Sequence, residues 1–276
     1  RQQVQRSQHL WVTNLDPRTL EVAEDVAPGR WSALPHPSMP DPRVPFAEAA
    51  PRRRRLLGDT NSEYLILLPA SQNWSKDHDK GSITALRAFV QLRRAGVDAG
   101  LVAVEWGHQL EESKAFLEES GVARHVTWVP LMPRLALQRT MANVDVVWDQ
   151  FGLEVFGALA LRALEQGTPL VSRGLAAEGE RFIGGPVPWR AAGTSDEIVR
   201  ETTAILKDMV ARGRNAVIAE TTDHYRGWLS YRHSPAVTAS LQQVRYEQIL
   251  EGHRESGGSA PDGWPTLVAL GAQRDA

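Results

Sequence analysis

The sequence contains no cysteine, and lysine is scarce beside arginine. The lack of cysteine excludes disulfide bonds and thiolate metal sites, and it suits a reducing compartment, so we expect a cytoplasmic protein. No uninterrupted apolar run approaches the roughly 20 residues of a membrane-spanning helix. The net charge of −2 provides no overall attraction to nucleic acid, and we expect no nucleic-acid partner. The first residues contain neither Met nor a signal-peptide pattern, so we expect the chain to begin inside a longer reading frame.

Apolar strand-length segments alternate with helical segments from residue 64 onward. Strands are expected at 64–69, 101–106, 125–130, 145–149 and 170–173, and helices at 83–94, 108–120, 134–143, 156–166, 194–212, 215–231 and 235–250. A short strand is expected at 9–14, followed by an irregular stretch that contains six prolines between Pro28 and Pro45. The alternation predicts an α/β fold of about six parallel strands with helices on both faces. Ligands of such sheets bind at the carboxyl ends of the strands.

The loop PASQNWSKDHDKGS follows the first strand of this pattern and contains two of the four lysines of the chain. It brings Lys76, Lys80 and Gly81 to the start of a helix, where unpaired N–H groups and the helix dipole favour anions. A lysine there is suited to a diphosphate. The alternative interpretation is a solvated polar loop.

The segment DQFGLEVFGALALRALEQGTPLV, residues 149–171, is a second strand end that leads into a helix. Gly152 and Gly157 would let the backbone approach a ligand closely, and the Glu154 carboxylate could accept hydrogen bonds from hydroxyl groups. Arg162 lies further along the helix, where it either binds an anion or is an ordinary surface residue. A generic dinucleotide site is excluded because no G-x-G-x-x-G follows a strand.

These motifs resemble, over residues 9 to about 250, the C-terminal part of family-4-type retaining glycosyltransferases with the GT-B fold. WSKDHDKG is similar to the family's phosphate loop W-S-x-K-G, and FGALALRALEQGTPLV is similar to F-G-L-x-x-L-E-A-M-A-x-G-x-P-V-V. VEWG at 104–107 and DVVWDQF at 145–151 resemble one bacterial branch. VTN and LPHP resemble the end of the acceptor domain, and RHSPAVTASLQQVRYEQIL resembles the closing helix.

The resemblance implies transfer of a sugar from a nucleotide diphosphate to an acceptor, with retention of configuration. It assigns catalytic roles to Lys80 and Glu154. Donor-binding roles fall on Lys76, Gly81, Gly107, Trp128, Val129, Gly152, Phe156, Gly157 and Arg162. Trp128 and Val129 would lie near the nucleotide base. The resemblance implies no metal, because GT-B enzymes of this kind do not generally need one, and no cofactor is expected.

Two family residues are absent. Arg162 stands where the family has its second glutamate, which holds the ribose, and the family's loop arginine has no counterpart near Ser71–Asn73. Arg162 could grip phosphate in the cleft, which we favour, pair with an acid such as Glu154, or turn outward. A non-catalytic relative of the family is therefore the alternative function. An epimerase or phosphorylase is a more distant one, because no pyridoxal lysine or paired epimerase carboxylates are evident.

The resemblance also divides the chain. Residues 1–58 would be the end of the acceptor domain with a Pro/Arg-rich linker, in which four arginines, 52–55, are either a solvated segment or an anion contact. Residues 59–252 would be the nucleotide-sugar-binding domain with its closing helix, and residues 253–276 a loosely ordered tail. The closing helix would expose an apolar stripe that faces the acceptor domain. The partners would be a nucleotide sugar and an unknown acceptor, with peripheral contact at the inner membrane face left open.

Overall fold

A computed structural model describes residues 10–12, 17–33, 38, 62–74, 79–175, 180 and 186–255. Lys76, the four arginines at 52–55 and the tail after residue 255 lie outside the described residues. None of the described helices is both long enough and apolar enough to span a membrane.

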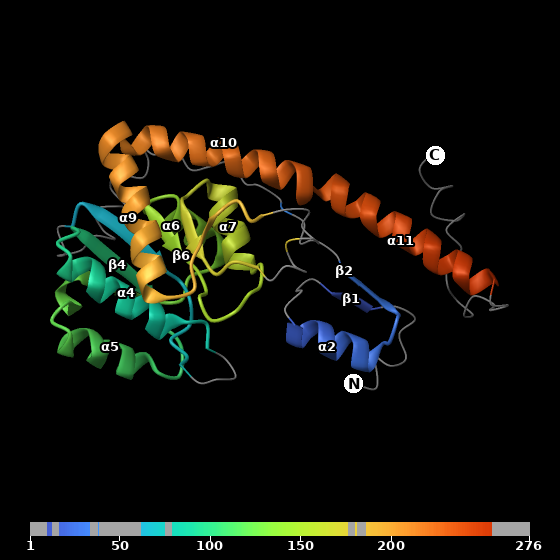
Figure 1. The fold of residues 1–276 in the computed structure, drawn as a ribbon, viewed down its shortest axis with the longest axis horizontal. Coiled ribbons are helices and arrows are strands. Elements are labelled where there is room, and N and C mark those ends of the chain that lie inside the picture. The colour runs from blue at the N-terminus through green and yellow to red at the C-terminus, as the bar shows by residue number, and fades with distance from the viewer. Residues whose placement is uncertain are drawn as a thin grey trace. The chain divides into compact units, whose positions relative to one another are not determined.

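A six-stranded, entirely parallel sheet forms the centre of the fold, as the alternating pattern predicts (Figure 1). Its strands are β3 (Tyr64–Leu68), β4 (Ala99–Val104), β5 (Val126–Val129), β6 (Val146–Trp148), β7 (Leu170–Ser172) and β8 (Arg190–Ala191). Their order across the sheet is β5-β4-β3-β6-β7-β8. The two-residue edge strand β8 was not predicted, because so short a segment carries no periodic signal.

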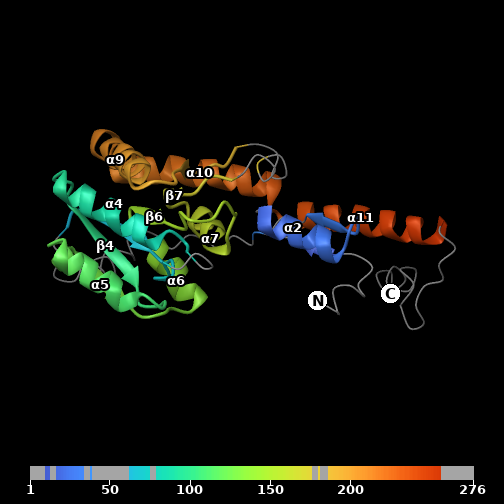
Figure 2. The same ribbon diagram turned by 60° about the horizontal axis from the view of Figure 1, so that its bottom comes forward.

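The helices lie on both faces of this sheet, and alternate side chains of β3 enter two different cores. Ile66 and Leu68 pack with α4 (Ser82–Arg94), α5 (Leu110–Glu119) and α9 (Ser195–Arg212). Leu65 and Leu67 pack with α6 (Arg134–Met141), α7 (Ala158–Gln166) and α10 (Arg214–Arg232). Figure 2 shows α4 beside α9, two helices that are in contact. Both faces of β3 are covered, which explains why its sequence is continuously apolar.

Two helix ends follow from local sequence. Gly167 terminates α7 with a left-handed φ of 63°, as expected for a glycine after a helix. Thr194 begins α9 with a capping box: its side chain accepts from the Glu197 backbone N–H, and the Glu197 side chain accepts from the Thr194 backbone N–H. The end of α7, before β7, and the start of α9, after β8, are therefore both fixed by local sequence.

The N-terminal region corrects one prediction. Residues expected to be irregular form α2 (Pro17–Val26), and β2 (Trp31–Ala33) then pairs in parallel with β1 (Leu10–Val12). Pro17 is compatible with a helix because it is the first helical residue, where a backbone N–H has no partner in any case. The next proline, Pro28, follows the end of the helix. The prolines from Pro28 onward predict irregular structure, and that prediction was wrong for the residues before Pro28.

Helix α11 (Pro235–Glu255) continues the chain after α10. Its residues from Ala239 on belong to a compact unit separate from residues 1–238. Leu241, Val244 and Tyr246 are about half exposed. Leu241 and Val244 share one face at a spacing of three, whereas Tyr246 lies on another, so the apolar stripe is narrow. Its expected packing against an acceptor domain stays a prediction.

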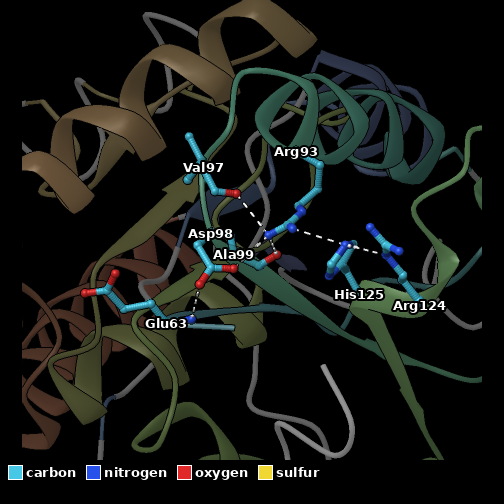
Figure 3. Close-up of polar contacts among 7 residues, drawn as sticks. All are labelled: Glu63, Arg93, Val97, Asp98, Ala99, Arg124 and His125. Atoms are coloured by element: carbon cyan, nitrogen blue, oxygen red, sulfur yellow. Dashed lines mark hydrogen bonds and ion pairs between the residues drawn. The ribbon is translucent and has the colours of Figure 1, made fainter. Parts of the chain in front are cut away.

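Arg93, in the last turn of α4, ties together the turn that leads into β4. Its Nη1 donates to the carbonyl oxygens of Val97 and Ala99 at 3.0 and 3.1 Å and to the Asp98 carboxylate at 3.1 Å (Figure 3). Asp98 also accepts from the backbone N–H of Glu63, immediately before β3. One guanidinium thus fixes the amino ends of two neighbouring strands.

His125, just before β5, completes this cluster. Its Nε2 faces Arg93 Nη2 and Arg124 Nε, each at 3.1 Å (Figure 3). Both partners are permanent donors, so Nε2 must accept and the ring must be neutral. Burial, followed by the charges of Arg93 and Arg124, holds the pKa of His125 below its ordinary value of 6.5.

Because of His125, the free energy of unfolding should therefore decrease as the pH is lowered. The unfolded chain takes up a proton at His125 as the pH falls through 6.5, whereas the folded chain does so only at lower pH, so unfolding is favoured in that window. We expect His125→Gln, which keeps an acceptor but cannot titrate, to lose less stability than the wild type between about pH 7.5 and about pH 5.5. Urea unfolding at both pH values tests this, and equal losses would contradict it.

Candidate functional site

The strand order places a topological switch point between β3 and β6. From β3 the chain proceeds outward through β4 and β5, and from β6 it proceeds the other way through β7 and β8. The loops that follow β3 and β6 therefore meet at the carboxyl edge, where ligands of such sheets bind. Their backbones touch: the Phe151 N–H donates to the Lys80 carbonyl oxygen at 2.7 Å.

Glycines allow this close contact. Gly81 has a φ of 76°, and a Cβ on it would lie 2.6 Å from the backbone nitrogen of Gly152. A Cβ on Gly152 would in turn collide with the Asp79 carbonyl oxygen. Gly107, on the loop after β4, approaches the backbone of Gln72 in the same way. In the structure, these three glycines make room for the backbone of a neighbouring loop. Their role in donor binding stays a prediction.

Gly81→Ala should therefore destabilise the protein beyond the cost of its backbone conformation. Gly96 provides a matched control, because its φ of 79° is nearly the same and nothing lies within 4 Å of its would-be Cβ. We expect Gly81→Ala to lower the free energy of unfolding by about 1–3 kcal/mol more than Gly96→Ala, the usual range for an overpacked site. Denaturant unfolding of both variants measures the difference. Equal losses would mean that the loop contact is dispensable.

Lys80 is held at this edge by its surroundings. Its Nζ lies 6.0 Å from the centre of the Trp106 ring, which comes from the loop after β4. The Trp106 indole N–H donates to the Pro69 carbonyl oxygen at 3.1 Å and so orients the ring. Among the described residues, no carboxylate forms an ion pair with Lys80. A positive charge is therefore available where the loops after β3, β4 and β6 converge.

The start of α7 adds partial positive charge at the same place. Gly157 is the N-cap residue and supplies no side-chain cap, and the first intrahelical bond runs from Leu161 N–H to the Gly157 carbonyl oxygen. The backbone N–H of Ala160, in the same turn, favours the ionised form of the Asp149 carboxyl and lowers its pKa. In the described part of the chain, no acceptor reaches the N–H groups of residues 158 and 159, which a helix start leaves unpaired. These two amides and Lys80 together favour an anion.

Asp149 is the first of two residues at this site that the sequence analysis did not predict. It directly follows β6 and is 3% exposed. Burial raises the pKa of its carboxyl to about 6, against the opposing influence of Lys80 and of the backbone N–H groups of Ala160 and Gln150. An acidic residue at the end of an otherwise apolar strand was the signal in the sequence that could have identified it.

Glu154 is paired with Arg173, a second residue that was not predicted. The Arg173 Nη2 donates to Glu154 Oε1 at 2.9 Å, and both side chains are more than a third exposed. Arg173 follows β7, and its backbone N–H donates to the Gln150 carbonyl oxygen. A basic residue immediately after a strand, at the carboxyl edge, was the available signal. The pair joins the loops after β6 and β7.

Arg162 forms an ion pair with a different acid from Glu154, the one that the sequence analysis names. Its Nη1 donates to both carboxylate oxygens of Glu165, at 2.7 and 2.5 Å, and the Glu165 side chain is fully buried. Ser38 and Gln138 also donate to Glu165. The favoured arrangement, in which Arg162 reaches into the cleft, is not the one found. The structure corresponds to pairing with a nearby acid, which is Glu165 and not Glu154.

The remaining predicted residues are distributed around this edge. Trp128 and Val129 end β5 and are partly buried, and the Val129 carbonyl oxygen accepts from the Glu105 N–H. Phe156 is buried and stacks on Trp189 with ring centres 5.5 Å apart. Phe156 therefore packs inside the fold in the structure. Lys76 lies outside the described residues.

A cavity of about 300 Å³ lies at the opposite edge of the sheet. It is lined by Pro169 and Pro188, which precede β7 and β8, and by residues of α9 and α10 that include Arg212 and Tyr225. Because it faces the amino ends of the strands, it is not where ligands of this architecture bind.

Comparison of the fold with solved structures finds glycosyltransferases. Anabaena HepE in complex with UDP and glucose superposes with a TM-score of 0.66 at 12% identity, covering 89% of this chain and 64% of that one. Sucrose-phosphate synthase from Thermosynechococcus elongatus gives 0.61 at 15% identity, covering 90% and 60%. A glycosyltransferase from Rickettsia africae gives 0.60 at 10% identity, covering 86% and 62%.

These similarities define the class of fold. Most of the chain has the GT-B glycosyltransferase fold, as the resemblance implies, and it spans less than two thirds of the length of these structures. No protein-family profile and no curated protein sequence matches the chain.

Proposed function

We propose that the six-stranded unit binds the diphosphate of a nucleotide sugar at the β3/β6 switch point, as the donor-binding half of a retaining glycosyltransferase. The observation that carries this is the convergence of Lys80 with the open amides at the start of α7. A diphosphate needs a fixed positive environment of this kind. HepE, which has the same fold, binds UDP and UDP-glucose.

Lys80 and these amides would act on the leaving group. Departure of the sugar from the diphosphate builds up negative charge on the phosphate oxygen. Fixed donors at that oxygen are each worth roughly 2.7–4 kcal/mol of the barrier, by analogy with oxyanion-hole donors. The backbone of Trp128 and Val129, at the end of β5, would lie along the base, and Glu154 would meet the donor sugar.

The alternative is a non-catalytic relative that binds nucleotide sugar weakly. One observation favours it: the residues at both signature positions are engaged in internal ion pairs, Glu154 with Arg173 and Arg162 with Glu165. Glu154 would have to leave Arg173 to meet a sugar, which is a modest change because the pair is partly exposed and such pairs contribute about 0–1 kcal/mol. The donor-binding proposal survives this pairing.

Two measurements separate these functions. Calorimetry of this chain with UDP-glucose tests donor binding, and absence of binding would refute the proposal for that donor class. Hydrolysis of the bound donor by the protein with its acceptor domain then tests chemistry, and binding without turnover would support the non-catalytic alternative. The same proposal includes an unidentified acceptor, no requirement for a metal or cofactor, and a cytoplasmic location, with contact at the inner membrane face left open.

A further inference from the structure

Asp149 is a buried carboxylate placed beside the proposed diphosphate site. Its Oδ2 is fully buried and has no hydrogen-bond partner among the described residues. The same oxygen lies 3.7 Å from where a Cβ on Gly157 would stand, so the carboxylate faces the first turn of α7. An unpartnered buried carboxylate oxygen is costly and calls for a functional explanation.

Few charged side chains of the described residues act on Asp149. The loop after β3 contributes Lys80, whose positive charge favours the ionised carboxylate. The loop after β7 contributes Arg173, which is already paired with Glu154. The first turn of α7, from residue 158 to residue 160, contributes only backbone N–H groups. Lys80 and the backbone N–H groups of Ala160 and Gln150 thus favour the ionised carboxylate, and Lys80 is also the group that would hold a diphosphate.

A bound diphosphate would therefore compete with Asp149 for positive charge and would repel it. We propose that Asp149 takes up one proton from solvent when a nucleotide sugar binds, so that donor binding is coupled to protonation of this carboxyl. The inference rests on the proposed function. The carboxylate becomes a neutral carboxylic acid, the proton comes from the buffer, and no bond of the donor is formed or broken. The acid can then donate a hydrogen bond, which the carboxylate cannot.

This coupling has the consequence that donor affinity depends on pH. The free carboxyl titrates with a pKa of about 6, so above that pH binding requires a proton that the free protein does not hold. Affinity should fall by up to about tenfold per pH unit as the pH rises above this value. Asp149→Asn, which has the same size and no charge, should bind donor with an affinity that does not change in this range.

Calorimetry in buffers of different ionisation enthalpy measures the proton directly. UDP-glucose is the appropriate probe, because its doubly esterified diphosphate does not titrate near neutral pH. For the wild-type chain above pH 6 we expect the observed enthalpy to vary with the buffer, which indicates proton uptake. The variation should vanish in Asp149→Asn and persist in Asp196→Asn, which removes an exposed carboxylate of α9.

The outcomes distinguish the inference from the function beneath it. Binding of UDP-glucose with no buffer dependence in the wild type would overturn the proton coupling and leave donor binding intact. Proton uptake that persists in Asp149→Asn would also overturn it, because another group would then be responsible. Absence of UDP-glucose binding at every pH would refute the proposed function and this inference with it. The wild-type measurement stands even if Asp149→Asn fails to fold.

Discussion

Arg162→Met should lower the free energy of unfolding by about 3–5 kcal/mol, the usual cost of removing one partner of a buried ion pair. Glu165 is fully buried, and Arg162 donates to both of its carboxylate oxygens. Without the guanidinium, Ser38 and Gln138 remain as the only donors to Glu165 among the described residues, and neither carries a charge. The midpoint of thermal unfolding should fall by about 6–20 °C.

A second change tests the cause of this loss. Glu165→Gln removes the buried charge and keeps a hydrogen-bonding side chain, so the double variant should recover much of the stability. Arg226→Met, which removes an exposed arginine from α10, should change stability by less than about 0.5 kcal/mol. UDP-glucose affinity of Arg162→Met should stay near the wild-type value. Unchanged stability with a large loss of affinity would instead restore the phosphate-gripping role of Arg162.

Lys80→Ala should weaken UDP-glucose binding by about 1.5–3 kcal/mol, or about 10- to 150-fold, which is the range for a charge-assisted hydrogen bond. Lys80 is oriented by the Trp106 ring at the carboxyl edge, and no described carboxylate pairs with it. Its charge is therefore free to act on a ligand. Some stability should also be lost at neutral pH, because the Lys80 charge favours the ionised form of the buried Asp149 carboxyl.

The matched control is Lys207→Ala, an exposed lysine of α9. It alters net charge by the same amount, so a general electrostatic effect on an anionic ligand would appear in both variants. Calorimetry of the two variants against the wild type isolates the local contribution. Equal affinities in Lys80→Ala and the wild type would remove Lys80 from the donor site.

Much of this architecture can be predicted from the sequence. Buried parallel strands are continuously apolar, so β3 and β4 are recognisable without any partner. Helix α2 was missed because the prolines after residue 28 dominated the interpretation of a segment that contains helix-forming residues. Strand β8 was missed because its two residues pair only at the edge of the sheet.

The site was only partly predictable for a physical reason. Strand ends identify Lys80, Glu154 and Gly157, since parallel strands bring their carboxyl ends to one edge. The ion-pair partner of an arginine is harder to predict than a strand end, because several acids lie within reach of each arginine. Arg162 and Glu165 are three residues apart on one helix and could have been matched by spacing. Arg173 and Glu154 meet only because β6 and β7 are adjacent.

The central claim is that a nucleotide sugar binds at the switch point between β3 and β6. Amide hydrogen exchange of the chain with and without UDP-glucose tests it most directly, because it reports where the ligand lies. We expect protection in residues 79–82 and 149–161, where Lys80 and the start of α7 meet. Protection confined to the residues around Arg212 and Tyr225, at the opposite edge of the sheet, would contradict the account.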